Sequence, residues 1–426
     1  MVLFMFLVFF GLMFLGVPFV VIIPASIIFT TIFFSGGISF YTIVQQMISG
    51  VRSPVLMAIP LFILAASIIT DGESSKRLVN AVNSSIGHLR GGLPISTSIS
   101  STFFGAVSGS TQATVAAIGQ TMYPLMLDAG YSSSFSLGLI INSSDIAYLI
   151  PPSIGAIVYG VVANVSVGKL FLACVGPGIL ISILFSIYSI IYSKVKKIPK
   201  LPKAPKDERN KAIKEASWLL GFPIIVIGGI YSGLFSPTEA AATSVAYAYF
   251  LELVIFKSLT FKNFKSQLLT TGWITGATFV LIGAGQAFSW LLSYNMIPQQ
   301  ILSSFIGTTQ ITPLKLVIMV NVAYFVACMF ISPVVAFYIL VPIFAPYVAS
   351  SGIDPLLLGV LVILQGAIGS ATPPFGCDIF TAQLIFRKPY FEIIREIGPF
   401  IAILVLSAVI IYLVPGIALF LPNIAF

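Results

Sequence analysis

Long apolar runs alternate with short polar interruptions along the whole chain. Several runs are as long as the roughly 20 residues that cross a bilayer as a helix, and no charged residue precedes Arg52. The pattern therefore predicts an all-α polytopic membrane protein. The apolar segments lie near residues 2–33, 52–70, 94–127, 133–164, 168–193, 217–256, 266–294, 314–349, 356–386 and 397–421.

Two of these segments are interrupted amid hydrophobic sequence. The segment 94–127 contains Ser108-Gly109-Ser110-Thr111, and the segment 133–164 contains Pro151-Pro152. Proline has no backbone N–H, so regular helical hydrogen bonding fails at such points. We therefore predict a re-entrant helical hairpin over 94–127 and a broken helix over 133–164.

The chain also repeats itself at an offset of 222 residues. Prolines and glycines fix the backbone shape, so their recurrence at one gap-free offset indicates an internal duplication. The offset aligns Ser110 with Ser332, Pro124 with Pro346, Gly130 with Gly352, Pro151-Pro152 with Pro373-Pro374, and Gly176-Pro177 with Gly398-Pro399. Paired broken segments are typical of transporters with inverted repeats and a binding site at the bilayer midplane.

This duplication predicts five regions along the chain. Residues 1–51 form an N-terminal scaffold span that is retained in the mature protein. Residues 52–193 form the first repeat, 194–214 a basic loop, and 215–265 scaffold helices. Residues 266–426 form the second repeat, with a hairpin over 314–349 and a broken helix over 356–386.

Charge and residue counts narrow the function. Charged residues make up 8% of the chain, against roughly 25% in a soluble domain. Nine of the 21 Lys and Arg residues lie between Lys194 and Lys214, which predicts a cytoplasmic loop; a basic patch for anionic partners is the alternative, and nucleic acid is not expected. The single histidine, His88, and three isolated cysteines exclude zinc-protease and Ser-His-Asp signatures, so no enzyme is predicted.

A helix that stops inside the membrane exposes carbonyl groups at one end and N–H groups at the other. Sodium prefers oxygen ligands, which Ser108, Ser110 and the carbonyls between Ala147 and Ile150 can supply. The second half repeats the pattern with Ser332-Pro333 and with the run from Gly369 to Gly376. Two related cation sites are therefore predicted; the alternative is that these small residues only allow close helix packing.

Polar residues near the breaks are candidates for binding a solute with a carboxylate. Helix N-termini favour anions, and no Arg lies near either motif to clamp a carboxylate. Asp145 and Asp378 each lie within six residues of a Pro-Pro pair and either bind sodium, take up protons or hydrogen-bond free amides. The candidate substrate-binding residues are Gly109, Thr111, Asn142, Asp145 and Ser332.

Two further acids have weaker functional signals. Glu239 follows Ser236-Pro237, a pattern that predicts the first turn of a helix. Glu252 is a candidate only because a carboxylate within an apolar segment is costly unless it is paired.

At these motifs, over nearly its whole length, the chain resembles the large membrane subunit of a TRAP transporter (tripartite ATP-independent periplasmic transporter, DctM-like). This sequence differs from the usual family pattern at three places, which are Ser144-Asp145, Cys328 and Ser332. The motifs that carry the resemblance are Phe104-Gly105-Ala106-Val107-Ser108-Gly109-Ser110, Leu149-Ile150-Pro151-Pro152-Ser153-Ile154, Gly168-Lys169-Leu170-Phe171-Leu172-Ala173, Phe235-Ser236-Pro237-Thr238-Glu239-Ala240-Ala241 and Ala371-Thr372-Pro373-Pro374-Phe375-Gly376.

The resemblance implies an inverted-repeat elevator transporter in the bacterial inner membrane, with two sodium sites. It also implies a separate small membrane subunit and a periplasmic binding protein that delivers an organic acid, sialic acid first and a C4-dicarboxylate second. The alternatives are a stand-alone sodium/dicarboxylate symporter, a passive channel and, third, an intramembrane enzyme. The implied sodium ligands are Ser108, Ser110, Ala147, Ile150 and Pro152 at one site and Cys328, Gly369, Thr372 and Phe375 at the other.

Overall fold

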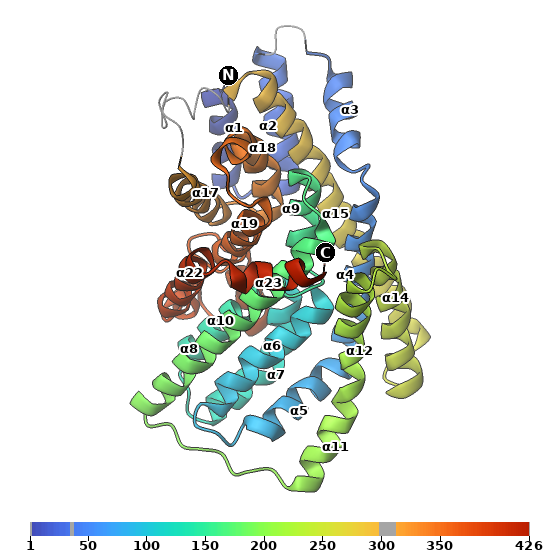
Figure 1. The fold of residues 1–426 in the computed structure, drawn as a ribbon, viewed down its shortest axis with the longest axis vertical. Coiled ribbons are helices and arrows are strands. Elements are labelled where there is room, and N and C mark those ends of the chain that lie inside the picture. The colour runs from blue at the N-terminus through green and yellow to red at the C-terminus, as the bar shows by residue number, and fades with distance from the viewer. Residues whose placement is uncertain (1, 35–37, 298–311, 426) are drawn as a thin grey trace.

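The computed structural model describes residues 2–34, 38–297 and 312–425, and every regular element in these ranges is a helix, as predicted (Figure 1). Residues 298–311, which belong to the predicted second repeat, lie outside the described ranges. The first-half helices are α1 (Val2–Phe14), α2 (Phe19–Phe34), α3 (Phe40–Gly50), η1 (Pro54–Met57), α4 (Ala58–Asp71), α5 (Ser74–Ile86), α6 (Gly92–Ser108), α7 (Thr111–Asp128), α8 (Ser133–Ser144), η2 (Asp145–Tyr148), α9 (Ile154–Ala163) and α10 (Val167–Val195). The remaining helices are α11 (Lys206–Ala216), η3 (Ser217–Leu220), α12 (Gly221–Pro223), η4 (Ile224–Gly228), α13 (Gly229–Tyr231), α14 (Pro237–Tyr249), η5 (Phe250–Ile255), α15 (Phe261–Tyr294), α17 (Pro313–Cys328), α18 (Pro333–Ser351), α19 (Pro355–Ser370), α20 (Cys377–Phe386), α21 (Tyr390–Ile394), α22 (Gly398–Leu413) and α23 (Gly416–Ala425).

Within the described ranges, five helices are long and apolar enough to cross a membrane. They are Pro54–Asp71, Val167–Val195, Lys206–Tyr231, Asn263–Tyr294 and Pro333–Ser351. A sixth span is possible if α22 and α23, which meet at an angle of 55°, cross as one bent unit. Length and composition therefore support a polytopic membrane protein, as the apolar pattern predicts.

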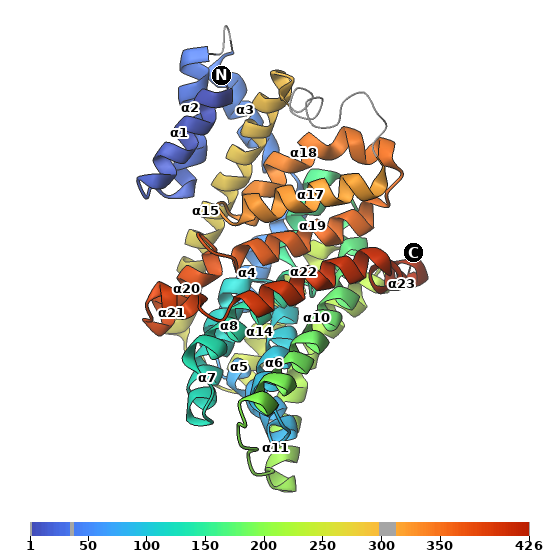
Figure 2. The same ribbon diagram turned by 90° about the vertical axis from the view of Figure 1, so that its left-hand side faces the viewer.

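The N-terminal region differs from the single span predicted for it. Helices α1 and α2 are separate and pack against each other, with a turn between them at Gly16–Pro18. Gly16 has φ +75°, a left-handed conformation that favours glycine, and Pro18 cannot continue a helix from the preceding residues. Helices α1, α2 and α3 gather at one end of the long axis, and α5 and α11 lie toward the other (Figure 2).

Each half contains a pair of packed helices followed by a broken helix. In the first half α6 packs on α7, and α8 with η2 is separated from α9 at Pro151-Pro152. In the second half α17 packs on α18, and α19 is separated from α20 at Pro373-Pro374. Both proline pairs contain a cis peptide bond.

The two halves interlock rather than standing apart. Helix α7 contacts α20, α9 contacts α18, and α19 contacts both η2 and α10. The long helix α15 packs against α2, α3 and α4, and it also contacts α18. These contacts place the hairpin tips of both halves near α4 and α15 in the middle of the molecule.

The segment between the halves is partly helical. Helix α10 continues to Val195, and α11 already begins at Lys206, so only part of the basic segment predicted as the loop 194–214 is extended chain. Asp207 and Glu208 occupy the first turn of α11, where negative charge is favourable.

The helix start predicted at Glu239 is confirmed. The Glu239 N–H donates to the Ser236 hydroxyl at 3.3 Å, and the Ser236 N–H donates to the Glu239 carboxylate at 2.7 Å. This reciprocal pair is a capping box, which satisfies two amides that the first turn of α14 leaves free.

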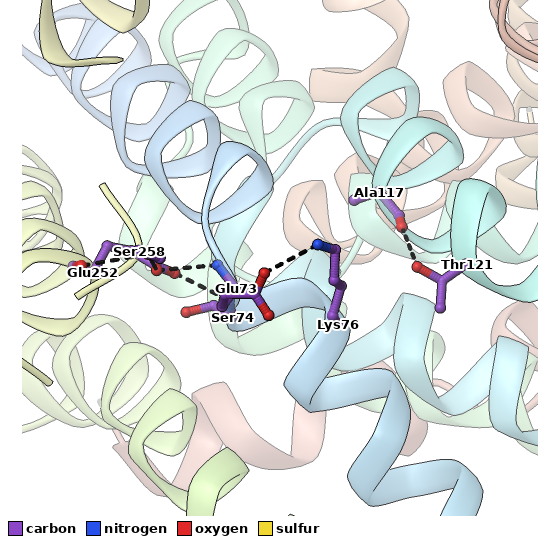
Figure 3. Close-up of polar contacts among 7 residues, drawn as sticks. All are labelled: Glu73, Ser74, Lys76, Ala117, Thr121, Glu252 and Ser258. Carbon is purple, nitrogen blue, oxygen red and sulfur yellow. Dashed lines mark hydrogen bonds and ion pairs between the residues drawn. The ribbon is translucent and has the colours of Figure 1, made fainter. Parts of the chain in front are cut away.

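Glu252 has a specific structural partner that the sequence did not reveal. Its buried carboxylate accepts the Glu73 and Ser74 N–H groups, both at 3.1 Å, and the Ser258 hydroxyl (Figure 3). These amides belong to the start of α5 and have no partner within that helix. Glu252 therefore fixes the point at which the chain turns from α4 into α5.

We predict that Glu252→Ala lowers the free energy of unfolding by about 3 kcal/mol, because two buried amides lose a charged acceptor. The measurement is the thermal unfolding midpoint of the purified protein in detergent. Glu73→Ala is the matched control, since the Glu73 side chain makes only an exposed ion pair with Lys76 at the same junction. Equal midpoints for the two variants would show that Glu252 is not an anchor.

Candidate functional site

A cavity of about 570 Å³ lies where the two hairpins meet α4 and α15. It is lined by polar residues from elements far apart in the sequence. The polar lining residues are Ser108, Ser110, Thr111 and Gln112 of the first hairpin, Ser332 of the second, Ser67, Thr70 and Asp71 of α4, Thr270 and Thr278 of α15, and Tyr148 and Ser370 of the broken helices.

The N-termini of two helices point at this cavity. Helix α7 begins after Ser110, whose hydroxyl accepts the Ala113 N–H at 3.4 Å, and α18 begins after Ser332. Helix N-termini carry partial positive charge and free N–H groups, so both favour an anionic group. Among the described residues that line the cavity there is no Lys, Arg or His, and Asp71 is the one acidic residue.

The first predicted cation site is assembled from the first hairpin and the first broken helix. Gly109 has φ +57°, and a Cβ added to it would collide with the Pro152 carbonyl oxygen. The backbone of Ala147 also lies close to the first hairpin, since a Cβ built on Gly105 would lie 2.7 Å from the Ala147 Cα. The buried Ser108 hydroxyl, which lies 3.2 Å from the Thr114 hydroxyl, is at this junction.

Carbonyl groups at the first break lose their regular donors. In an unbroken helix the N–H groups of residues 151 and 152 would reach the carbonyls of Ala147 and Tyr148, but prolines have none. The Tyr148 carbonyl accepts the Ser153 hydroxyl instead. Ile150 is buried, with its side chain against Gly178 of α10.

The second predicted site has the same construction. Gly369 packs on Cys328 so closely that an added Cβ would collide with the Cys328 Cβ. The Phe375 N–H donates to the Met329 carbonyl at 3.2 Å, and the Thr372 hydroxyl donates to the Ile368 carbonyl at 2.6 Å. The structure therefore brings all four predicted residues of this site to the junction of α17 and α19.

The predicted substrate-binding residues separate into two groups. Thr111 and Ser332 line the cavity, whereas Gly109, Asn142 and Asp145 are not among its lining residues. Asn142 and Asp145 are buried, with the Asn142 amide donating to the Gly138 carbonyl at 2.8 Å.

Sequence reasoning missed the wall formed by α4 and α15. Thr270, Ile274 and Thr278 recur at intervals of four, which places them on one face of α15. Ser67, Thr70 and Asp71 have similar spacing on α4. This spacing can be seen in the sequence, but the internal repeat at an offset of 222 residues marks only the breaks at proline and glycine.

Two solved structures share this all-helical architecture. The YdaH transporter of Alcanivorax borkumensis superposes with a TM-score of 0.61 over 87% of this chain and 86% of that chain, at 14% identity. MtrF of Neisseria gonorrhoeae, whose structure is described in a report on antimetabolite efflux pumps, superposes with a TM-score of 0.53 over 87% and 82%, at 12% identity. At such identities the likeness concerns the fold.

The match to a family of sequences says more about this chain than the likeness of fold does. Residues 6–417 match the family of the DctM component of tripartite ATP-independent periplasmic transporters, and the chain belongs to this family. It is therefore the large permease of a TRAP transporter, a multi-pass protein of the bacterial inner membrane and not an enzyme.

Relatives within the family differ in their named solutes. The ectoine TRAP transporter large permease TeaC of Halomonas elongata is 51% identical over 417 residues, 98% of this chain and 97% of TeaC. UehC of Ruegeria pomeroyi, named for ectoine and 5-hydroxyectoine, is 51% identical over 385 residues, 90% of each chain. The sialic acid permease SiaM of Vibrio cholerae is 34% identical over 418 residues, 97% and 96% of the two chains.

We predict that Gly109→Ala lowers solute uptake at least about tenfold, because the added Cβ collides with Pro152 and alanine disfavours a positive φ by about 1–2 kcal/mol. Uptake into proteoliposomes, normalised to protein, is the measurement. The control is Gly272→Ala, since a Cβ on this helical residue meets nothing within 4 Å. Normal uptake by Gly109→Ala would contradict the close junction.

Proposed function

We propose that this permease imports a zwitterionic organic acid of the ectoine type, coupled to sodium. The observation that carries the proposal is the charge arrangement of the cavity. Two helix N-termini favour a carboxylate, Asp71 favours a positive group, and none of the described lining residues is basic. A solute with one carboxylate and one cationic group matches both features.

The relatives support this solute class over the two that the sequence suggested. Ectoine carries a carboxylate and a delocalised amidinium cation, and the two ectoine permeases share 51% identity with this chain, against 34% for the sialic acid permease. A C4-dicarboxylate has no positive group to pair with Asp71. We therefore place an ectoine-like zwitterion ahead of sialic acid and of C4-dicarboxylates.

Sodium coupling is supported by the chemistry of the two breaks. Hydroxyl and carbonyl oxygens gather where each hairpin tip meets its broken helix, and hard monovalent cations prefer such ligands. Ser108 and Ser110 with the backbone near Ala147, Ile150 and Pro152 form the first proposed set. Cys328, Gly369, Thr372 and Phe375 contribute to the second.

An elevator movement is the transport mechanism that suits this arrangement. The cavity lies between the hairpin tips on one side and α4 and α15 on the other. If the hairpins and broken helices slide as one body along α4 and α15, both cation sites move with the solute. Glu252 binds the amides at the turn from α4 into α5 and would keep this turn fixed during the movement.

The family also supports partners for this chain. We propose a small membrane subunit as a separate chain and a periplasmic binding protein that delivers the solute. The exposed apolar surface, including Phe14, Leu234 and Leu384, faces lipid or the small subunit.

The test is uptake of radiolabelled ectoine by proteoliposomes that contain this chain and its small subunit. We expect uptake to require external sodium and the binding protein, and excess unlabelled sialic acid or succinate to leave it unchanged. Uptake without the binding protein would indicate a stand-alone carrier, and non-saturating flux without sodium dependence would indicate a channel.

In the same assay we expect Ser110→Ala and Thr372→Ala to raise the sodium concentration for half-maximal uptake about tenfold, equal to about 1.4 kcal/mol of lost binding. Each variant removes one hydroxyl at a proposed site. Thr121→Ala, on α7 beyond the cavity, is the control. Unchanged sodium activation in both variants would remove these residues from the coupling sites.

We further predict that Asp71→Asn weakens uptake of the zwitterion, with a rise of about tenfold in the half-saturating solute concentration, because the cationic group loses its counter-charge. Asp128→Asn is the matched control, since Asp128 also ends a helix and is exposed, but lies outside the cavity. If both variants saturate at the wild-type concentration, Asp71 does not recognise the solute.

A further inference from the structure

Two acidic side chains, one from each half, meet in the interior beside the cavity. Asp145 begins η2 and is 1% exposed, and Asp378 lies in the first turn of α20 and is 0% exposed. Their carboxyl groups face each other, and Ser370 lies beside both. The pair therefore forms only when the first and second halves are packed together.

The two carboxylates differ in their hydrogen-bond partners. Asp378 accepts the Thr111 hydroxyl at 2.8 Å and the Ser370 hydroxyl at 2.9 Å. The Ser370 hydroxyl and the Asp378 carboxyl group are near neighbours of Asp145, but within the described residues neither oxygen of Asp145 has a partner with hydrogen-bond geometry. Asp145 is thus a buried carboxylate without a donor, next to a second carboxylate.

A third side chain, from the end of α8 just before Asp145, also has an oxygen without a partner. Asn142 lies three residues before Asp145, a spacing that places both on one face, and it is 0% exposed. Its Oδ1 has no donor within the described residues, although its amide group is bonded to Gly138. Three buried acceptor oxygens, two of Asp145 and one of Asn142, therefore lack a partner.

These groups require a positive charge. Carboxylates held close together in a medium of low dielectric repel strongly, and burying them without compensation is strongly unfavourable. None of the three ion pairs recorded for the described residues involves either aspartate. A shared proton would serve one oxygen of Asp145 and leave the oxygen of Asn142 without a donor, whereas a bound cation can serve several oxygens at once.

The ligand set indicates the kind of cation. The candidate ligands in this cluster are oxygen atoms of Asp145, Asp378 and Asn142. Transition metals prefer nitrogen and sulfur ligands, while carboxylate, amide and hydroxyl oxygens suit hard cations. The membrane-embedded setting and the two negative charges fit a small alkali ion.

We propose that Asp145 and Asp378 bind a sodium ion between the two halves, at a site separate from the two at the Pro-Pro breaks. Asn142 Oδ1 supplies a further neutral ligand. The inference deepens the sodium coupling proposed above and rests on it for its role in transport. It adds an ion whose ligands come from both repeats at once.

The position of this site also suggests how binding of the ion is coupled to binding of the solute. Thr111 and Ser370 line the cavity and donate their hydroxyl protons to Asp378. One layer of hydroxyl groups thus separates the solute from the aspartate pair. Binding of a solute that reorients Thr111 changes the ligands of the ion, which links solute binding to ion binding.

The test counts bound sodium directly. Purified wild-type protein and the variants Asp145→Asn and Asp378→Asn, in detergent, are equilibrated with ²²Na⁺, and the bound ions per chain are determined. We expect each variant to bind one ion fewer than the wild type and their double variant to bind no fewer than either. Ser144→Ala, a buried neighbour whose hydroxyl donates to the Ile140 carbonyl, is the control for folding and keeps the full count.

The outcomes separate this site from the proposed coupling. An unchanged sodium count and affinity in both aspartate variants would overturn the site, even if uptake by the wild type depends on sodium. Sodium-independent uptake, together with loss of one bound ion in the variants, would overturn the coupling and leave the site in place. A third outcome would also overturn the proposal. If Asp145→Asn and Asp378→Asn elute as monodisperse protein and bind sodium as the wild type does, but release fewer protons when the sample is acidified and returned to its starting pH, the two aspartates share a proton instead of a sodium ion.

Discussion

Interrupting a helix in the middle of a membrane leaves backbone polar groups that must find partners inside the protein. The structure meets this requirement by pressing each hairpin tip against a broken helix. The Ile154 N–H donates to the Gly109 carbonyl at 3.4 Å in the first half, and the Phe375 N–H donates to the Met329 carbonyl at 3.2 Å in the second. These contacts hold both junctions, and residues of both hairpin tips line the cavity together with residues of α4 and α15.

Small residues make these junctions possible. Gly109 allows the hairpin tip to reach the Pro152 carbonyl, and Gly105 and Gly369 allow helices to approach Ala147 and Cys328 within a distance that any side chain would prevent. The same glycines therefore serve packing and site formation together. Close packing by small residues is thus a feature of both junctions, and it does not conflict with the proposed supply of oxygen ligands at the same places.

The electrostatics of the interior rely on dipoles and a few buried charges. Two helix N-termini supply positive potential to the cavity, and none of the described residues that line it is basic. Acidic side chains lie at its edge, at Asp71, and beside it, at Asp145 and Asp378. This distribution is the basis of the proposed zwitterionic solute and of the proposed sodium coupling.

The sequence by itself determined the helical membrane class, the two breaks and their equivalence, because hydrophobic length, proline and glycine act locally on the backbone. It also determined the helix start at Ser236 to Glu239, which depends on contacts within four residues. Only the tertiary structure decided that α4 and α15 form a wall of the cavity, that Glu252 caps α5 from 178 residues away, and that Asp145 meets Asp378. Those contacts join segments far apart in the chain, and their geometry depends on how the helices pack, which no local pattern of residues specifies.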